Sequence, residues 1–80
     1  MVIEVLGPGC PRCEQLLEEV RYLLVREGIG AGVEHVTDLQ AIAAFGPLAT
    51  PALVIDGRVK STGRIPPPGQ ILKWLRVTDD

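Results

Sequence analysis

Apolar residues follow two different periods in the first third of the chain, and each period predicts an element. Val2 to Leu6 is apolar on both faces except at Glu4, which predicts a strand covered on both sides. Beyond a Gly-Pro-Gly break, apolar positions recur at i, i+3, i+4 and i+7, which predicts an amphipathic helix that ends at Gly28. The apolar positions of this helix are Cys13, Leu16, Leu17, Val20, Leu23 and Leu24.

The middle of the chain predicts a second strand and a second helix. Val33 to Val36 is a short strand-like run. Thr37 and Gln40 have the spacing of a capping box, in which each side chain bonds a free backbone N–H at a helix start. The helix that they open is expected to run through Phe45.

The last third predicts a hairpin and a closing helix. Asp56-Gly57 stands between two β-prone runs, 52–55 and 58–61, and this pair suits a tight turn whose central residues both need positive φ. After a run of three prolines, the segment 70–77 predicts a final helix. The expected order is therefore βαβαββα.

Composition and charge argue against two classes of function, nucleic-acid binding and membrane association. The formal net charge is −2 over 80 residues, and the basic residues are scattered, so nucleic-acid binding is not expected. The start of the chain has no signal-peptide pattern, and no stretch has the ~18 apolar residues of a membrane span. We expect no membrane association and a cytoplasmic location, where thiols stay reduced.

The two cysteines of the chain form a Cys-x-x-Cys motif, Cys10-Pro11-Arg12-Cys13, at the start of the first helix. Such a pair can close and reopen a disulfide, and a helix N-terminus favours the thiolate. Cys10 precedes the helix and is expected to be the nucleophile. Cys13 belongs to the apolar stripe and is expected to resolve the mixed disulfide. The alternative is that both are buried small hydrophobic residues.

Metal binding is the main chemical rival. Two Cys and one His cannot supply the four Cys/His ligands of a closed zinc site in one monomer, so no metal site is assigned. A soft monovalent metal held by two thiolates stays open. Heavy-metal-associated domains also carry Cys-x-x-Cys after their first strand, but they usually have Met where this chain has Pro8.

Thr50-Pro51 before the third strand and Gly63-Arg64 after the hairpin complete a pattern with the cysteine motif. Together they resemble the thioredoxin-like superfamily, in particular its small thioredoxins or glutaredoxin-like redox-active disulfide proteins, over 2–75. The resemblance implies a cis Pro51 beside the disulfide and a Thr50 backbone that pairs an extended substrate. It also implies that residues 1–80 form a single α/β domain with a minimal thioredoxin-like fold.

In that fold, a four-stranded mixed sheet carries helices on both faces. The first and third strands are expected to be central and parallel, and the hairpin is expected to supply an antiparallel edge. The first and last helices are expected to share one face, with the second helix on the other.

Two charged residues are candidates for tuning the thiols. Arg12 is either a solvated residue at the helix start or a cation that stabilises the thiolate and raises the reduction potential. Glu4 stands six residues before Cys10, where thioredoxins carry a buried acid that exchanges protons with the resolving Cys. Its alternative is a carboxylate at a strand end, or one paired across the sheet with Lys60 or Arg58. We expect His35 to be a half-exposed strand residue.

The predicted function is a thiol–disulfide oxidoreductase that reduces or exchanges disulfides of protein substrates with Cys10 and Cys13. It needs no bound cofactor, and a reductase or glutathione is expected to return the electrons. The alternative is a non-enzymatic protein that uses the same thiols as a soft-metal carrier or redox sensor.

Overall fold

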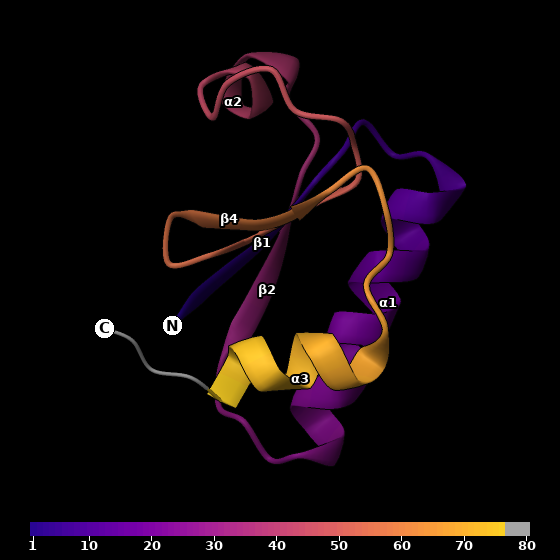
Figure 1. Ribbon diagram of the computed structural model, residues 1–80, viewed down its shortest axis with the longest axis vertical. Coiled ribbons are helices and arrows are strands. Elements are labelled where there is room, and N and C mark those ends of the chain that lie inside the picture. The colour runs from indigo at the N-terminus through magenta and orange to yellow at the C-terminus, as the bar shows by residue number, and fades with distance from the viewer. Residues whose placement is uncertain (77–80) are drawn as a thin grey trace.

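A four-stranded sheet with three helices forms the molecule in a computed structural model, which describes residues 1–76 (Figure 1). The elements are β1 (Val2–Leu6), α1 (Pro11–Arg26), β2 (Gly32–Val36), α2 (Leu39–Ala43), β3 (Ala52–Ile55), β4 (Arg58–Thr62) and α3 (Pro68–Arg76). This is the predicted βαβαββα order. The strand order across the sheet is β2-β1-β3-β4, so β1 and β3 are central as expected.

The direction of β3 differs from the prediction. β1 and β2 are parallel, with α1 as the crossover, but β3 runs antiparallel to β1 and starts with Ala52 opposite Leu6. A parallel return needs a connection that travels back along the whole sheet. α2 instead stays near the end of the sheet at which β1 and β2 finish (Figure 1), so β3 starts at that end. The expectation of parallel central strands was therefore wrong.

The two faces of the sheet bury separate clusters, as the apolar pattern of β1 predicts. One face packs against α1 and α3. The fully enclosed residues of the cluster between this face and the two helices include Ile3, Val5, Leu16, Leu23, Leu53 and Ile71. The other packs against α2 through Leu6, Ile42, Ala52 and Val54. Strand alternation explains this division, because successive side chains point to opposite faces. The expected placement of the three helices is confirmed.

Two helix starts differ from the prediction. Asp38, not Thr37, caps α2, and its carboxylate accepts a 3.3 Å hydrogen bond from the N–H of Gln40. A carboxylate also complements the positive end of the helix dipole, which a hydroxyl does not. α3 starts at Pro68 rather than Gln70. The predicted end of this helix, Val77, lies outside the described residues.

The hairpin turn forms as predicted and is joined to the first strand. Asp56 and Gly57 both have positive φ, 50° and 79°, as the tight turn between β3 and β4 requires. The N–H of Val2 donates to the Asp56 carboxylate over 2.8 Å, and the N–H of Asp56 donates to the Val2 carbonyl over 2.7 Å. These bonds anchor the start of β1.

The segments that carry the candidate site residues lie together at the opposite end of the sheet. The loop after β1, the start of α1 and the loop before β3 all lie where β1 ends. Within residues 1–76, no helix has the length and apolarity needed to cross a membrane.

Candidate active site

The two thiols meet at the start of α1. Cys10 is the N-cap of this helix and Pro11 occupies its first turn, where a missing N–H needs no partner. The Sγ atoms of Cys10 and Cys13 lie 2.6 Å apart, and both cysteines are free. The Cys13 N–H also donates to Cys10 Sγ over 3.3 Å. This geometry allows the pair to close into a disulfide with small movements.

Burial and hydrogen bonding shift the pKa values of the two thiols in opposite directions. The pKa of Cys10 is lowered, first by the hydrogen bond from the Cys13 side chain and next by the Cys13 N–H. The pKa of Cys13 is raised, first by burial and next by its hydrogen bond to Cys10. Cys10 is partly exposed, whereas Cys13 is completely enclosed. Cys10 is therefore the accessible sulfur and the one that ionises more readily.

Gly7 packs directly on the enclosed sulfur. A Cβ atom at this position would lie 2.1 Å from Cys13 Sγ and 3.0 Å from Cys13 Cβ, so a side chain there would displace the thiol. Sequence reasoning interpreted Gly7 only as part of a strand-breaking loop. Its role depends on contact with a residue on another element, and the local pattern carries no signal for that contact.

The Thr50-Pro51 segment lies beside the same glycine. The peptide bond between the two residues is cis, as the family resemblance implies, and Pro51 is fully buried. Thr50 Cβ is 3.7 Å from the position that a Cβ of Gly7 would occupy. The segment thus lies next to Gly7, on which Cys13 packs.

Arg12 reaches from α1 to the loop after β4. Its guanidinium donates to the carbonyl of Gly63 over 3.0 Å, although the side chain is exposed. The backbone N–H of Arg12 also lowers the pKa of Cys10, after the side chain and the N–H of Cys13. The side chain is therefore engaged with the neighbouring loop, a contact that neither sequence interpretation of Arg12 included.

Glu4 lies across the sheet from α1. It is paired with Val54 of β3, and Val54 belongs to the cluster under α2. Cys13 belongs to the helix that covers the other face. The proton-relay role of Glu4 stays a prediction, and this register places its side chain on the sheet face away from Cys13.

His35 contributes a contact that sequence reasoning missed. The residue is partly buried, as expected of a half-exposed strand position, and stands beside Val5 on the sheet face under α1. Its Nε2 lies 3.1 Å from the Gly7 carbonyl, so Nε2 carries the hydrogen. The Gly7 N–H in turn donates to the Val36 carbonyl over 3.0 Å. Both backbone polar groups of Gly7 are therefore held by β2.

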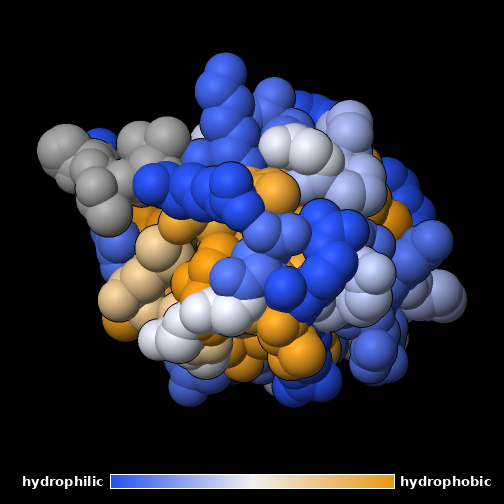
Figure 2. Space-filling model, turned by 90° about the horizontal axis from the view of Figure 1, so that it is seen from below, coloured by the Kyte–Doolittle hydropathy of each residue, from blue (hydrophilic) through white to orange (hydrophobic). Residues whose placement is uncertain are grey.

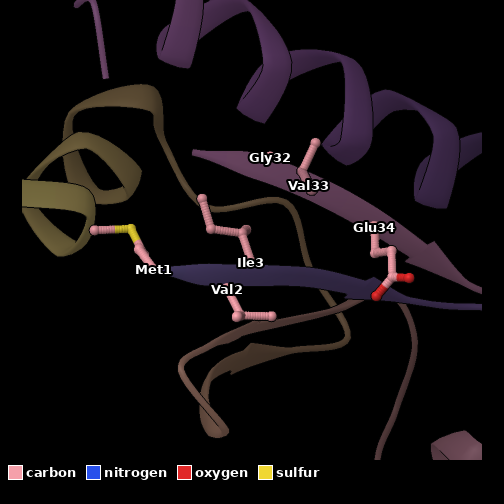
Figure 3. A pocket seen from close by; sticks show the side chains of 6 residues that line it. All are labelled: Met1, Val2, Ile3, Gly32, Val33 and Glu34. Carbon is pink, nitrogen blue, oxygen red and sulfur yellow. The ribbon is translucent and has the colours of Figure 1, made fainter. Parts of the chain in front are cut away.

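A pocket of about 320 Å³ opens at the other end of the sheet, between the starts of β1 and β2 (Figure 3). Ile3 and Val33 point toward the helices there, whereas Val2 and Glu34 point to the opposite face. Seen from below, the surface of the molecule shows apolar patches broken by polar side chains (Figure 2). This pocket is separate from the thiols, because Cys13 packs on Gly7, beyond the far end of β1.

Comparisons with known proteins agree with this geometry. A family model for the thioredoxin domain matches residues 1–76. A thioredoxin from Methanothermobacter thermautotrophicus is 33% identical over 75 residues, which cover 94% of this chain and 97% of that protein. A thioredoxin from Methanocaldococcus jannaschii is 34% identical over 76 residues, covering 95% and 87%. The matched region contains both thiols and the Thr50-Pro51 segment, and the chain belongs to the thioredoxin-domain family.

Proposed function

We propose that this protein is a dithiol–disulfide oxidoreductase that reduces or exchanges disulfides of protein substrates. The observation that carries the proposal is the pairing of a partly exposed sulfur of lowered pKa, Cys10, with an enclosed sulfur of raised pKa, Cys13, 2.6 Å away. Membership of the thioredoxin family supports thiol–disulfide oxidoreductase activity in general terms.

The reaction takes place in two exchanges. The Cys10 thiolate attacks one sulfur of the substrate disulfide, forms a mixed disulfide and releases the other substrate sulfur as a thiolate. Cys13 gives up its proton to the released thiolate and attacks Cys10 Sγ. This step forms the Cys10–Cys13 disulfide and releases the second substrate sulfur as a thiolate, which takes its proton from solvent. Two electrons therefore pass from the protein to the substrate, with one proton from Cys13 and one from solvent.

The substrate segment is expected to lie along Thr50 and Pro51, because Thr50 lies beside Gly7, on which the Cys13 thiol packs, and both residues precede β3. The oxidised protein is reset when an external dithiol returns two electrons. A reductase of the kind that serves thioredoxins is the donor that family membership favours, and the comparisons give no support for glutathione. A reducing compartment such as the cytoplasm suits this cycle.

Reduction of insulin disulfides, driven by an external dithiol, tests the proposal. Cys10→Ser should abolish the reaction because no attacking sulfur remains. Reduced Cys13→Ser, mixed with insulin in the absence of the external dithiol, should retain the first exchange and accumulate a mixed disulfide, detectable as a covalent adduct of protein and insulin chain. An intact reaction in Cys10→Ser would contradict the mechanism.

Two further measurements address the electron donor and the alternative function. Reduction of the oxidised protein by a thioredoxin reductase, compared with reduced glutathione, identifies the donor class. Titration of the fully reduced protein with Cu⁺ tests the alternative of a soft-metal carrier. Stoichiometric metal binding without insulin reduction would replace the proposed enzyme with that carrier.

A further inference from the structure

We infer that Arg12 is a positioning residue that ties the start of the thiol-bearing helix to the Thr50-Pro51 loop through the backbone of Gly63. The inference rests on the proposed function and assigns a role to a side chain that stands between the two cysteines. It differs from charge tuning, because it depends on a directed hydrogen bond and not on the cation.

The contacts form a short connected path. The Arg12 guanidinium donates to the Gly63 carbonyl over 3.0 Å. The N–H of the same glycine donates to two carbonyls of the preceding loop, those of Ala49 over 3.0 Å and Pro51 over 2.9 Å. The Gly63 carbonyl therefore accepts a hydrogen bond from α1, and the Gly63 N–H donates to the two residues that flank Thr50 in the chain.

The geometry of Gly63 shows that this junction is tightly built. Its φ is +72°, and a Cβ atom there would lie 3.0 Å from the Cβ of Ala49. Both observations favour glycine, the first because L side chains rarely adopt this conformation and the second because an added Cβ would press on the Ala49 side chain. The junction holds the Ala49–Pro51 segment close to the loop after β4, and Arg12 adds α1 to the same junction.

The consequence for catalysis concerns the separation between Cys10 and the substrate. Arg12 is two residues from Cys10 on the first turn of α1. A substrate bound along Thr50 has its disulfide in line with Cys10 only while the helix start and this loop keep their relative position. Small shifts in such positioning reduce rates even when the reacting groups are intact. A small disulfide that does not bind along the loop does not depend on that alignment.

Three forms of the full chain separate the tether from charge tuning. Arg12→Met removes both charge and donor. Replacement of Arg12 by citrulline, through ligation of a synthetic peptide at Cys13, keeps an N–H donor of the same reach and removes the charge. Arg21→Met, an exposed position on the same helix, is the matched control. Each form is assayed with insulin and with hydroxyethyl disulfide, and the alkylation rate of Cys10 is followed against pH.

The tether predicts that Arg12→Met lowers kcat/KM for insulin about two- to tenfold, the range expected for one hydrogen bond. Its rate with hydroxyethyl disulfide and the pH profile of Cys10 should match those of the unmodified protein. The citrulline form and the Arg21→Met control should keep the kcat/KM for insulin. Equal losses with both disulfides, and a Cys10 profile shifted to higher pH in the citrulline form, would overturn the tether in favour of charge tuning. An unchanged kcat/KM for insulin in Arg12→Met would also overturn it.

Hydrogen exchange at the Gly63 amide supplies a readout that does not require activity. The tether predicts faster exchange in Arg12→Met and restored protection in the citrulline form. Equal protection in both would overturn the tether. Failure of the proposed function has a different signature, since the unmodified protein would then reduce neither disulfide while the exchange pattern at Gly63 persisted.

Discussion

Cys10 and Cys13 differ because one is at the surface and the other is not. Enclosure of Cys13 in an apolar setting favours its neutral form and raises its pKa. Cys10 receives hydrogen bonds from the Cys13 side chain and backbone, which favour the thiolate and lower its pKa. At the scale of single residues, the order of attack follows from these opposite environments.

Alkylation tests that order. At slightly acid pH, iodoacetamide should label Cys10 first, because its lowered pKa leaves more thiolate there and its sulfur is accessible. Peptide mapping by mass spectrometry after brief reaction identifies the labelled residue. In the control Cys13→Ser, Cys10 should still be labelled, but more slowly, because loss of the Cys13 thiol raises the pKa of Cys10. Preferential labelling of Cys13 would reverse the two roles.

Gly7 is the residue whose replacement should affect the resolving thiol most directly. Gly7→Ala places a methyl group 2.1 Å from Cys13 Sγ, so the thiol or the strand end must shift. Overpacking of this kind costs about 1–3 kcal/mol. We expect that loss in the free energy of unfolding, measured with urea, together with slower resolution of the mixed disulfide.

Gly30→Ala is the matched control for this change. Within residues 1–76, no atom beyond its two chain neighbours lies within 4 Å of the Cβ position of Gly30, so the same substitution should leave stability and resolution close to those of the unmodified protein. Equal stability of Gly7→Ala and Gly30→Ala would show that the loop after β1 adjusts without cost.

At the scale of elements, each end of α1 is joined to a segment that follows β4. Its first turn reaches Gly63 through Arg12. Its C-cap, Glu27, forms ion pairs with Arg26 and with Arg76 of α3. The two helices on one face are thus connected by charge as well as by their shared apolar cluster. This arrangement makes the helix pair sensitive to pH at one end.

Glu27→Gln tests the charged connection. The pKa of Glu27 is lowered, first by Arg26 and also by Arg76, so its stabilisation is fully present above the unfolded-state pKa and is lost as pH falls through the lowered value. The variant should have a lower Tm at neutral pH, and the difference should disappear in acid. Glu18→Gln, exposed on the same helix, is the control. A difference that persists in acid would assign the effect to packing.

At the scale of the whole molecule, stability depends on a small core that the sheet divides in two. A chain of 80 residues has on the order of 4–12 kcal/mol of total stability. Leu53 lies on the central strand β3, between β1 and β4, and is completely buried in the cluster under α1 and α3. One large core residue therefore accounts for a substantial fraction of the total.

Leu53→Ala should lower the free energy of unfolding by about 2–5 kcal/mol, because a cavity opens in the middle of the sheet. Urea denaturation followed by circular dichroism measures the loss. Val59→Ala on the edge strand β4, where the side chain is 38% exposed, should cost much less. Similar losses at both positions would show that the core can collapse around the vacated site.

The sequence by itself determined the features that depend on neighbours a few residues apart. Residues one to four positions apart predict three such features: the apolar stripe of α1, the Asp56-Gly57 turn and the Cys10/Cys13 pair at a helix start. The family resemblance, which rests in part on Thr50-Pro51, also predicted the overall fold and the cis peptide bond. The helix cap was misplaced by one residue because Thr37 and Asp38 both have capping side chains.

Only the tertiary structure decided the features that depend on distant segments. The direction of β3 depends on where α2 lies, and the face of Glu4 depends on the pairing of β1 with β3. Arg12 bonds a residue 51 positions away, and His35 bonds one 28 positions away. No local pattern encodes such partners, because they become neighbours only when the sheet has formed and has placed its loops at one end.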